Sequence, residues 1–253
     1  MTPFWLDHLL VVVLSVFFPI RAATFGFRRL SRAPLEHVAG VRRTLYLQAI
    51  ALQWGLSTVA LALWLMRERS ARALGLEPRA PGPLLAGLVG AVVIAGAFWF
   101  IRRRVRAEPE ALDRTLEKLH HIERMLPHTR PEKRLFHVVA ITAGICEELL
   151  YRGYLLWYLA HWFAAIPAVV LSSAIFGLGH SYQGPRGIVT TTLVGLVMAT
   201  IYLASGALWP AMAVHAIIDM HAGELAYAAL DRPRTSTVNP DVGGIAERAE
   251  EPS

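Results

Sequence analysis

Long apolar segments recur along this chain of 253 residues. A helix that crosses a bilayer needs about 20 mostly apolar residues, because each residue rises about 1.5 Å through a hydrocarbon core about 30 Å thick. Segments of this kind lie at 4–20, 45–66, 83–101, 134–160, 164–180, 187–204 and 207–229. Hydrophobic residues make up 55% of the chain, which is too apolar for an ordinary soluble domain. The sequence therefore predicts an all-α, multi-pass transmembrane helical bundle of about seven spans, or eight if the segment 134–160 breaks near Gly153.

The charges predict how this bundle is oriented. The net charge is +6, and Arg residues gather in the stretches 21–43 and 102–134, which fall on one side if there are seven spans. Lys and Arg accumulate in cytoplasmic loops, so we expect the C-terminus in the cytoplasm and the N-terminus outside. The loop 67–82 carries four Arg residues and lies on the opposite side in this scheme. Because the Arg residues flank apolar spans, they favour a bacterial inner or plasma membrane as the location, and no nucleic-acid partner is expected.

The chain divides into three parts by composition. Residues 1–133 are predicted to be N-terminal membrane helices plus a cytoplasmic amphipathic helix at about 107–130, where apolar residues recur every three or four positions. Residues 134–230 hold the polar groups that suggest chemistry, and we expect a catalytic helical core there. Residues 231–253 are polar with scattered Pro and Gly, and this tail is predicted to be disordered.

Two adjacent carboxylates, Glu147 and Glu148, lie inside the apolar segment 134–160. A charged side chain near a bilayer centre costs about 2.5–3.5 kcal/mol even on lenient scales, so such groups are functional candidates. Glu148 and Arg152 are four residues apart and can pair on one helix face. Glu147 points about 100° away around the helix. We therefore expect Glu148 and Arg152 to form a structural pair and Glu147 to be the chemical group.

Two later apolar helices also carry polar residues at a spacing of four. Phe176 precedes His180, and His215 precedes Asp219, so each pair shares a helix face. Taken singly, His180 suits a helix end that faces water, and His215 suits a hydrogen-bonded core histidine. Taken together with the glutamates, they predict a buried hydrolytic site in which Asp219 either orients His215 or provides a further polar contact itself. The single Cys146 excludes an internal disulfide and a paired-cysteine metal site, and we expect it to be a small buried residue.

At these residues the chain resembles the CPBP family, the CAAX-protease and bacteriocin-processing membrane proteins also called the Abi family. Its motifs are EExxxR, FxxxH and HxxxN or HxxxD on successive helices. They read here as Glu147-Glu148-Leu149-Leu150-Tyr151-Arg152, Phe176-Gly177-Leu178-Gly179-His180 and His215-Ala216-Ile217-Ile218-Asp219. The similarity covers about residues 134–230, and three motifs in order are far more specific than any one of them.

The resemblance to type II CAAX prenyl endopeptidases implies a role for each residue. Glu147 with His180 would activate the attacking water, and His215 with Asp219 would stabilise the oxyanion. Glu148, Arg152 and Phe176 would support the site. The prenyl endopeptidases have Asn where this chain has Asp219. Since a carboxylate must be protonated before it can donate a hydrogen bond, this difference puts the oxyanion role in question and leaves room for a metal.

Three hypotheses follow for the function. The first is an intramembrane endopeptidase that acts on a peptide or a membrane protein, lipidated or not, within the lipid bilayer. Its chemistry is either cofactor-free, with Glu147 as general base, or uses a divalent metal such as zinc held by Glu147, His180 and His215. The second is a non-catalytic membrane scaffold or immunity-type protein of the same family. The third is a transporter whose buried charges form an ion path, against which the lack of an evident internal repeat argues.

Overall fold

The computed structural model of the protein describes residues 2–21, 24 and 27–231. Helices are the regular elements of this part of the chain, which contains no β-strand. The long helices are α4 (Val38–Met66), α6 (Pro81–Ala107), α8 (Arg130–Glu148), α11 (Gly184–Ser205) and α12 (Leu208–Leu230). The shorter ones are α1 (Trp5–Val12), α2 (Phe18–Arg21), α3 (Phe27–Ser31), α5 (Ala71–Leu74), α7 (Pro109–Leu119), α9 (Leu156–Leu159) and α10 (Ala165–Leu178). The polar tail predicted for 231–253 lies outside the described residues, except for Asp231.

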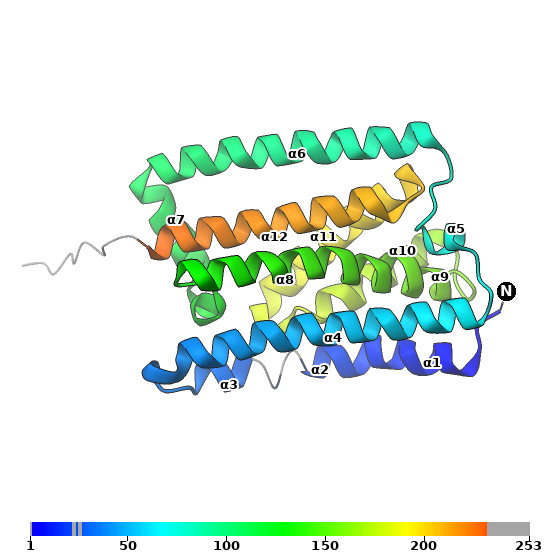
Figure 1. Cartoon of the computed structure of the whole chain (residues 1–253), viewed down its shortest axis with the longest axis horizontal. Helices are drawn as coiled ribbons and strands as arrows, with labels where there is room; N and C mark the ends of the chain where they lie inside the picture. The colour runs from blue at the N-terminus through cyan, green and yellow to red at the C-terminus, as the bar shows by residue number, and fades with distance from the viewer. Residues whose placement is uncertain (1, 22–23, 25–26, 232–253) are drawn as a thin grey trace, which may run out of the picture.

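Helix α8 runs through the middle of the bundle, between α4 on one side and α12 on the other (Figure 1). Helix α6 covers α12, and α1 lies beside α4 at the opposite face. Every residue from 146 to 156 is buried, including both glutamates. A helix that is apolar around its whole circumference belongs in the centre of a structure, and here that centre also holds the charged pair. The segment with the glutamates is thus the core of the fold rather than one of its faces.

The turn that follows the two glutamates is a π-helix, η5 (Leu149–Leu155), which leads into α9. A π-helix bonds residue i to residue i+5, so it widens the turn by one residue, and such turns are frequent at functional sites. Arg152 lies in this wide turn, and its side chain is fully enclosed at 1% exposure. The sequence pattern alone gives no sign of the change from α-helix to π-helix.

Three helical segments of the described chain are long and apolar enough to cross a membrane: Leu35–Met66, Pro81–Ala107 and Ser181–Ser205. The all-helical fold and a membrane location are therefore confirmed, whereas the count of seven or eight spans is not. The reason lies in the residues that build the core. Helices α8 and α12 carry carboxylates and histidines, which lower their mean hydropathy. Helix α10 is apolar but has only 14 residues, which is too short to cross the membrane.

The Arg-rich segments separate to opposite ends of the molecule. Helices α3 and α7 lie at one end, and α5 lies at the other (Figure 1). The loop 67–82, which runs against the predicted charge asymmetry, does not present all its Arg residues to solvent. Arg69 forms a buried bidentate pair with Asp7, with N–O distances of 2.8 and 2.5 Å, and Arg72 pairs with Glu77. Two of the four Arg residues of this loop therefore have carboxylate partners.

The predicted amphipathic segment is helical, as α7 followed by the 3₁₀ turn η4 (His120–Met125). Its apolar residues Leu112 and Leu126 are buried, and α7 lies against α12 and α6. The apolar side of this segment therefore contacts the helical bundle.

Two glycines set how closely the helices of the core approach one another. A Cβ atom on Gly144 would lie 2.8 Å from the carbonyl oxygen of Met212 and 2.9 Å from the backbone nitrogen of Ala216. A Cβ on Gly177 would lie 2.8 Å from the carbonyl oxygen of Ile188 on α11. Small residues allow such backbone contact between membrane helices. Because Gly144 lies three residues before Glu147, and Ala216 follows His215, the same contact brings the glutamate and the histidine together.

The substitution Gly144→Ala is expected to lower the free energy of unfolding by about 1–3 kcal/mol, because the new methyl group meets backbone that cannot rotate away. Gly96→Ala is the matched control, since a Cβ on Gly96 of α6 has no atom within 4 Å. The control should leave stability unchanged or slightly raised. Thermal unfolding in detergent measures both variants, and equal transition temperatures would contradict the close contact of α8 and α12.

Candidate active site

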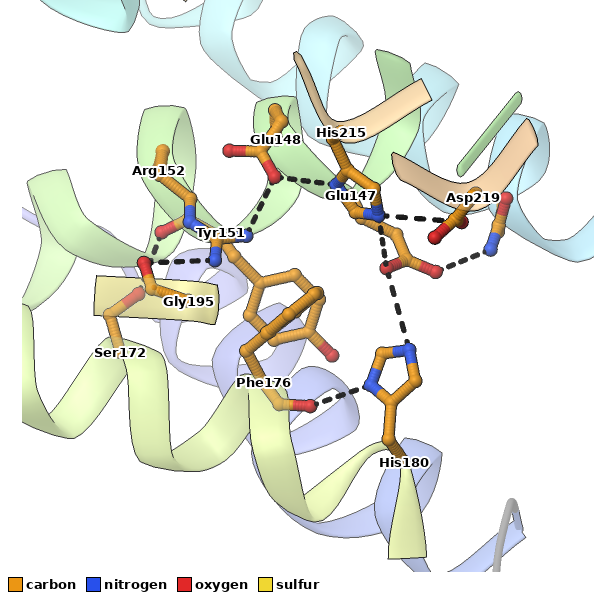
Figure 2. A network of polar contacts seen from close by, with 11 residues as sticks. Glu147, Glu148, Tyr151, Arg152, Ser172, Phe176, His180, Gly195, His215 and Asp219 are labelled. Atoms are coloured by element: carbon orange, nitrogen blue, oxygen red, sulfur yellow. Dashed lines mark hydrogen bonds and ion pairs between the residues drawn. The ribbon is translucent and has the colours of Figure 1, made fainter. Parts of the chain in front are cut away.

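Glu147 is the next-to-last residue of α8, and its carboxylate faces side chains from α4, from α12 and from the turn after α10. Its Oε1 accepts a hydrogen bond of 2.6 Å from the amide nitrogen of Gln53 on α4. Its Oε2 is buried and accepts no hydrogen bond from the described residues. That oxygen lies 3.9 Å from Nε2 of His180 and 3.9 Å from Nε2 of His215 (Figure 2). These distances exceed a direct hydrogen bond, so the two imidazoles face Glu147 without closing on it.

Glu148 faces the other way and is held by two positive or proton-donating groups. Its Oε1 accepts hydrogen bonds from Nη1 of Arg152 at 2.9 Å and from Nδ1 of His215 at 2.7 Å. The second amino group of Arg152 donates to the carbonyl oxygen of Gly195 on α11 at 3.2 Å. The side chains of Glu148 and Arg152 are 0% and 1% exposed. The structure thus contains the predicted pair, and Glu148 also joins it to His215.

His180 follows α10, at the turn that leads to α11. Its Nδ1 lies 3.0 Å from the carbonyl oxygen of Phe176. A carbonyl oxygen only accepts, so Nδ1 carries a proton and Nε2 of the neutral ring keeps a free lone pair. That Nε2 is the atom which faces Glu147. The side chain is 17% exposed, so His180 lies at the partly open edge of the polar cluster.

His215 and Asp219 come from one face of α12. The Nδ1 of His215 donates to Glu148, and its Nε2 lies 3.6 Å from Oδ2 of Asp219. The side chain of His215 is 6% exposed, whereas that of Asp219 is 38% exposed. Asp219 therefore lies at the mouth of the cluster, and His215 lies inside it between the two glutamates.

Phe176 packs against the charged groups with its ring and orients His180 with its backbone. The guanidinium carbon of Arg152 lies 4.2 Å from the ring centroid, a cation–π contact. The rings of His180 and His215 lie 4.8 and 5.8 Å from the same ring, which fixes their positions on two sides. The packing role predicted for Phe176 from its spacing matches this placement.

The structure brings all seven predicted site residues into one cluster (Figure 2). The sequence reading missed Gln53, which lies almost 100 positions before Glu147 and binds it directly. A polar amide in an otherwise apolar span was the available signal, since such groups are costly in a membrane. The reading also missed Gly195, because a backbone carbonyl that accepts from Arg152 leaves no trace in a motif.

The donor atoms of the cluster were tested for a metal site. A tetrahedral zinc site with bonds of about 2.0–2.1 Å places its ligand atoms about 3.3 Å apart. The two pairs that Glu147 forms with the histidines are 3.9 Å long, and no three His, Cys, Asp or Glu side chains of the described chain are arranged to hold a metal ion. The residue types fit zinc, but their spacing in this structure does not.

Fold and site together define a helical membrane protein with an acid–base cluster of three carboxylates and two imidazoles, in which Asp219 is the most exposed member. The model of the family described as type II CAAX prenyl endopeptidase Rce1-like matches residues 133–221, which contain all three motifs. The chain therefore carries a domain of this protease family, and the resemblance predicted from the motifs is confirmed. Curated proteins and solved structures give no match to the chain.

Proposed function

We propose that the protein is a multi-pass intramembrane endopeptidase in which Glu147 activates a water molecule to hydrolyse a peptide bond. One observation carries the proposal: the oxygen of Glu147 that accepts no hydrogen bond from the described residues faces two imidazole nitrogens, each 3.9 Å away. A distance of this length is too long for a direct hydrogen bond, but it leaves room for a water molecule between the carboxylate oxygen and an imidazole nitrogen. The family of the matching domain, which comprises peptidases, supports the same chemistry.

The hydrolysis proceeds in two steps. Glu147 takes a proton from water as the water oxygen attacks the carbonyl carbon of the peptide, and the carbonyl oxygen becomes an oxyanion. His180 accepts a hydrogen bond from the same water at its free Nε2 and so directs the attack. The C–N bond then breaks, and the proton held by Glu147 passes to the leaving amine. No metal is needed for these steps.

His215 is proposed to stabilise the oxyanion. The carboxylate of Glu148 accepts a hydrogen bond from Nδ1–H and so stabilises the charged imidazolium, whose Nε2–H can donate a hydrogen bond to the developing negative charge. Arg152 keeps Glu148 in place for this purpose. Glu148 and Arg152 thus act through His215 and have no contact with the substrate.

The substrate is proposed to be a peptide or a membrane protein, with or without a lipid group, in a bacterial inner or plasma membrane. The buried cluster lies beside helices of membrane-spanning length, so the scissile bond must enter from the bilayer or its edge. A short peptide that carries a prenyl group and a transmembrane peptide are the two substrate classes to compare.

The test is a cleavage assay on the purified full-length protein in detergent. Quenched fluorescent peptides, prenylated and unprenylated, and transmembrane peptides are incubated with wild type and with Glu147→Ala. Cleavage by the wild type alone, unchanged by a chelator, supports the proposal. Cleavage that is lost on chelation and restored by zinc would overturn the metal-free chemistry. Absence of cleavage by both proteins, together with a cellular phenotype that survives Glu147→Ala, would favour the scaffold hypothesis.

Asp219 gives a separate prediction about the oxyanion. Asn in its place donates hydrogen bonds without being protonated first, so Asp219→Asn is expected to keep or raise kcat. Asp219→Leu removes the polar group and is expected to lower kcat by about 10²–10³-fold if the residue contacts the oxyanion. Steady-state kinetics on one peptide distinguish the pair, and equal activity of the Leu variant would show that Asp219 has no such role.

A further inference from the structure

Gln53 contributes a polar group to the site from outside the family domain. It lies on α4, far from the matched residues 133–221, in a helix whose buried face is formed by Arg42, Tyr46, Gln53, Ser57, Ala60 and Trp64. Its side chain amide nitrogen donates to Oε1 of Glu147 at 2.6 Å, and the residue is 6% exposed. None of the three motifs includes this residue.

We infer that Gln53 is a positioning residue that fixes the carboxylate of Glu147, so that Oε2 is the oxygen presented to His180 and His215. The inference rests on the proposed function and adds to it the group that selects the reacting oxygen. It follows from the geometry, since the two carboxylate oxygens have different partners: Oε1 binds the amide, and Oε2 faces the imidazoles.

The terminal torsion of a glutamate has a broad energy minimum, so packing alone sets its orientation poorly. A hydrogen bond from a neighbouring helix sets it well. The amide also occupies one lone pair of Oε1, which leaves Oε2, the oxygen that faces the histidines, as the better placed acceptor of the proton from water. Displacement of a reacting group by about 1 Å can cost about 10²-fold in rate, so loss of this bond should be visible in kcat.

The oxygen of the Gln53 amide indicates that this side chain does not serve mainly to stabilise the fold. The Oε1 atom of Gln53 is buried and has no hydrogen-bond partner among the described residues. A buried polar atom without a partner costs free energy, so an apolar side chain of equal length here would remove this cost while it took the donor from Glu147, and the two effects on stability would offset each other. A glutamine that served only the fold would therefore add little, and one that serves Glu147 has a reason to be retained.

The position of α4 is itself fixed, which a positioning residue requires. Arg42, on the same buried face, donates from Nε and Nη2 to Glu132 at the start of α8, at 3.0 and 2.8 Å. This buried ion pair and the close packing of α4 on α8 hold the two helices in register. Gln53 and Glu147 therefore each lie on a helix whose position is fixed.

The experiment compares Gln53→Met with Gln48→Met in the full-length protein. Both replace an amide with an apolar side chain of similar length on α4, but Gln48 is exposed. Gln53→Met is expected to lower kcat by about 10–100-fold, with KM changed less than about twofold and an unfolding temperature that is not reduced. Gln48→Met should change none of the three. A merely structural role predicts the opposite pattern, a lower unfolding temperature with the kcat of the folded protein unchanged, and that result would overturn the inference.

Two further measurements separate this inference from the proposed function. In a Glu147→Gln background, Gln53→Met should cause no additional loss, since the group that it positions is gone. If Glu147→Gln leaves cleavage intact, the proposed function fails; if Glu147→Gln is inactive but Gln53→Met equals wild type, only the positioning role fails. Infrared difference spectra of wild type minus Glu147→Gln give a readout without substrate. The Glu147 carboxylate band should shift in Gln53→Met, and an unshifted band would overturn the hydrogen bond.

Discussion

Glu147→Gln is expected to lower kcat by about 10²–10⁴-fold, the usual contribution of a general base. The amide has the same shape as the carboxylate but cannot take a proton from water. The substitution removes the oxygen that faces both His180 and His215. Neither other carboxylate of the cluster is placed to replace it, because Glu148 Oε1 is held by Arg152 and Asp219 lies at the exposed mouth. Single-turnover cleavage of a quenched peptide, with KM measured alongside, is the appropriate assay.

The matched control for this variant is Glu77→Gln. Glu77 is also a glutamate in an ion pair, but its side chain is 54% exposed and lies in the loop with Arg72. The control should retain full activity, because exposed pairs contribute little and Glu77 has no contact with the cluster. An active Glu147→Gln protein would remove the general-base mechanism altogether.

Arg152→Met is expected to lower the free energy of unfolding by about 3–5 kcal/mol, since it leaves Glu148 as a buried charge without its cation. The two side chains are 1% and 0% exposed, so water cannot take the place of the lost partner. The same substitution at Arg72, whose side chain is 59% exposed, should cost at most about 1 kcal/mol. Chemical denaturation in detergent compares the two directly.

The double variant Glu148→Gln with Arg152→Met tests the origin of that effect. Removal of both charges should destabilise the protein less than the sum of the two single changes, because each single change leaves one charge unpaired. Additive effects would show that the two residues do not interact, despite the 2.9 Å distance between them.

Much of the site could be predicted because its residues follow helical spacing. Glu148 with Arg152, Phe176 with His180 and His215 with Asp219 each lie four residues apart, and a spacing of four places both members on one helix face in an α-helix. Burial of charge in an apolar segment then identified these helices as the ones that meet. The family match covers residues 133–221, the segment that contains these positions.

The features that were missed depend on contacts between distant segments or on backbone geometry. The contact of Gln53 with Glu147 joins positions 94 apart, and a single sequence contains no rule that pairs them. The π-helix after Glu148 is a change of backbone geometry that the pattern of side chains does not indicate. The number of spans could not be fixed for a related reason. Length and hydropathy identify helices that face lipid, whereas α8 and α12 are built to face each other.

The shortness of α10 determines how deep in the bilayer the chemistry would take place. Its 14 residues follow the exposed aromatic pair Trp162 and Phe163, and aromatic residues of this kind favour the membrane interface. In the proposed arrangement, His180 would then lie about 22 Å below that interface, and only about 8 Å of a 30 Å hydrocarbon layer would remain beyond it. Water and an extended peptide would reach the site by the shorter path, through the leaflet boundary opposite Trp162 and Phe163. The opposite leaflet would serve only to hold the helices in place.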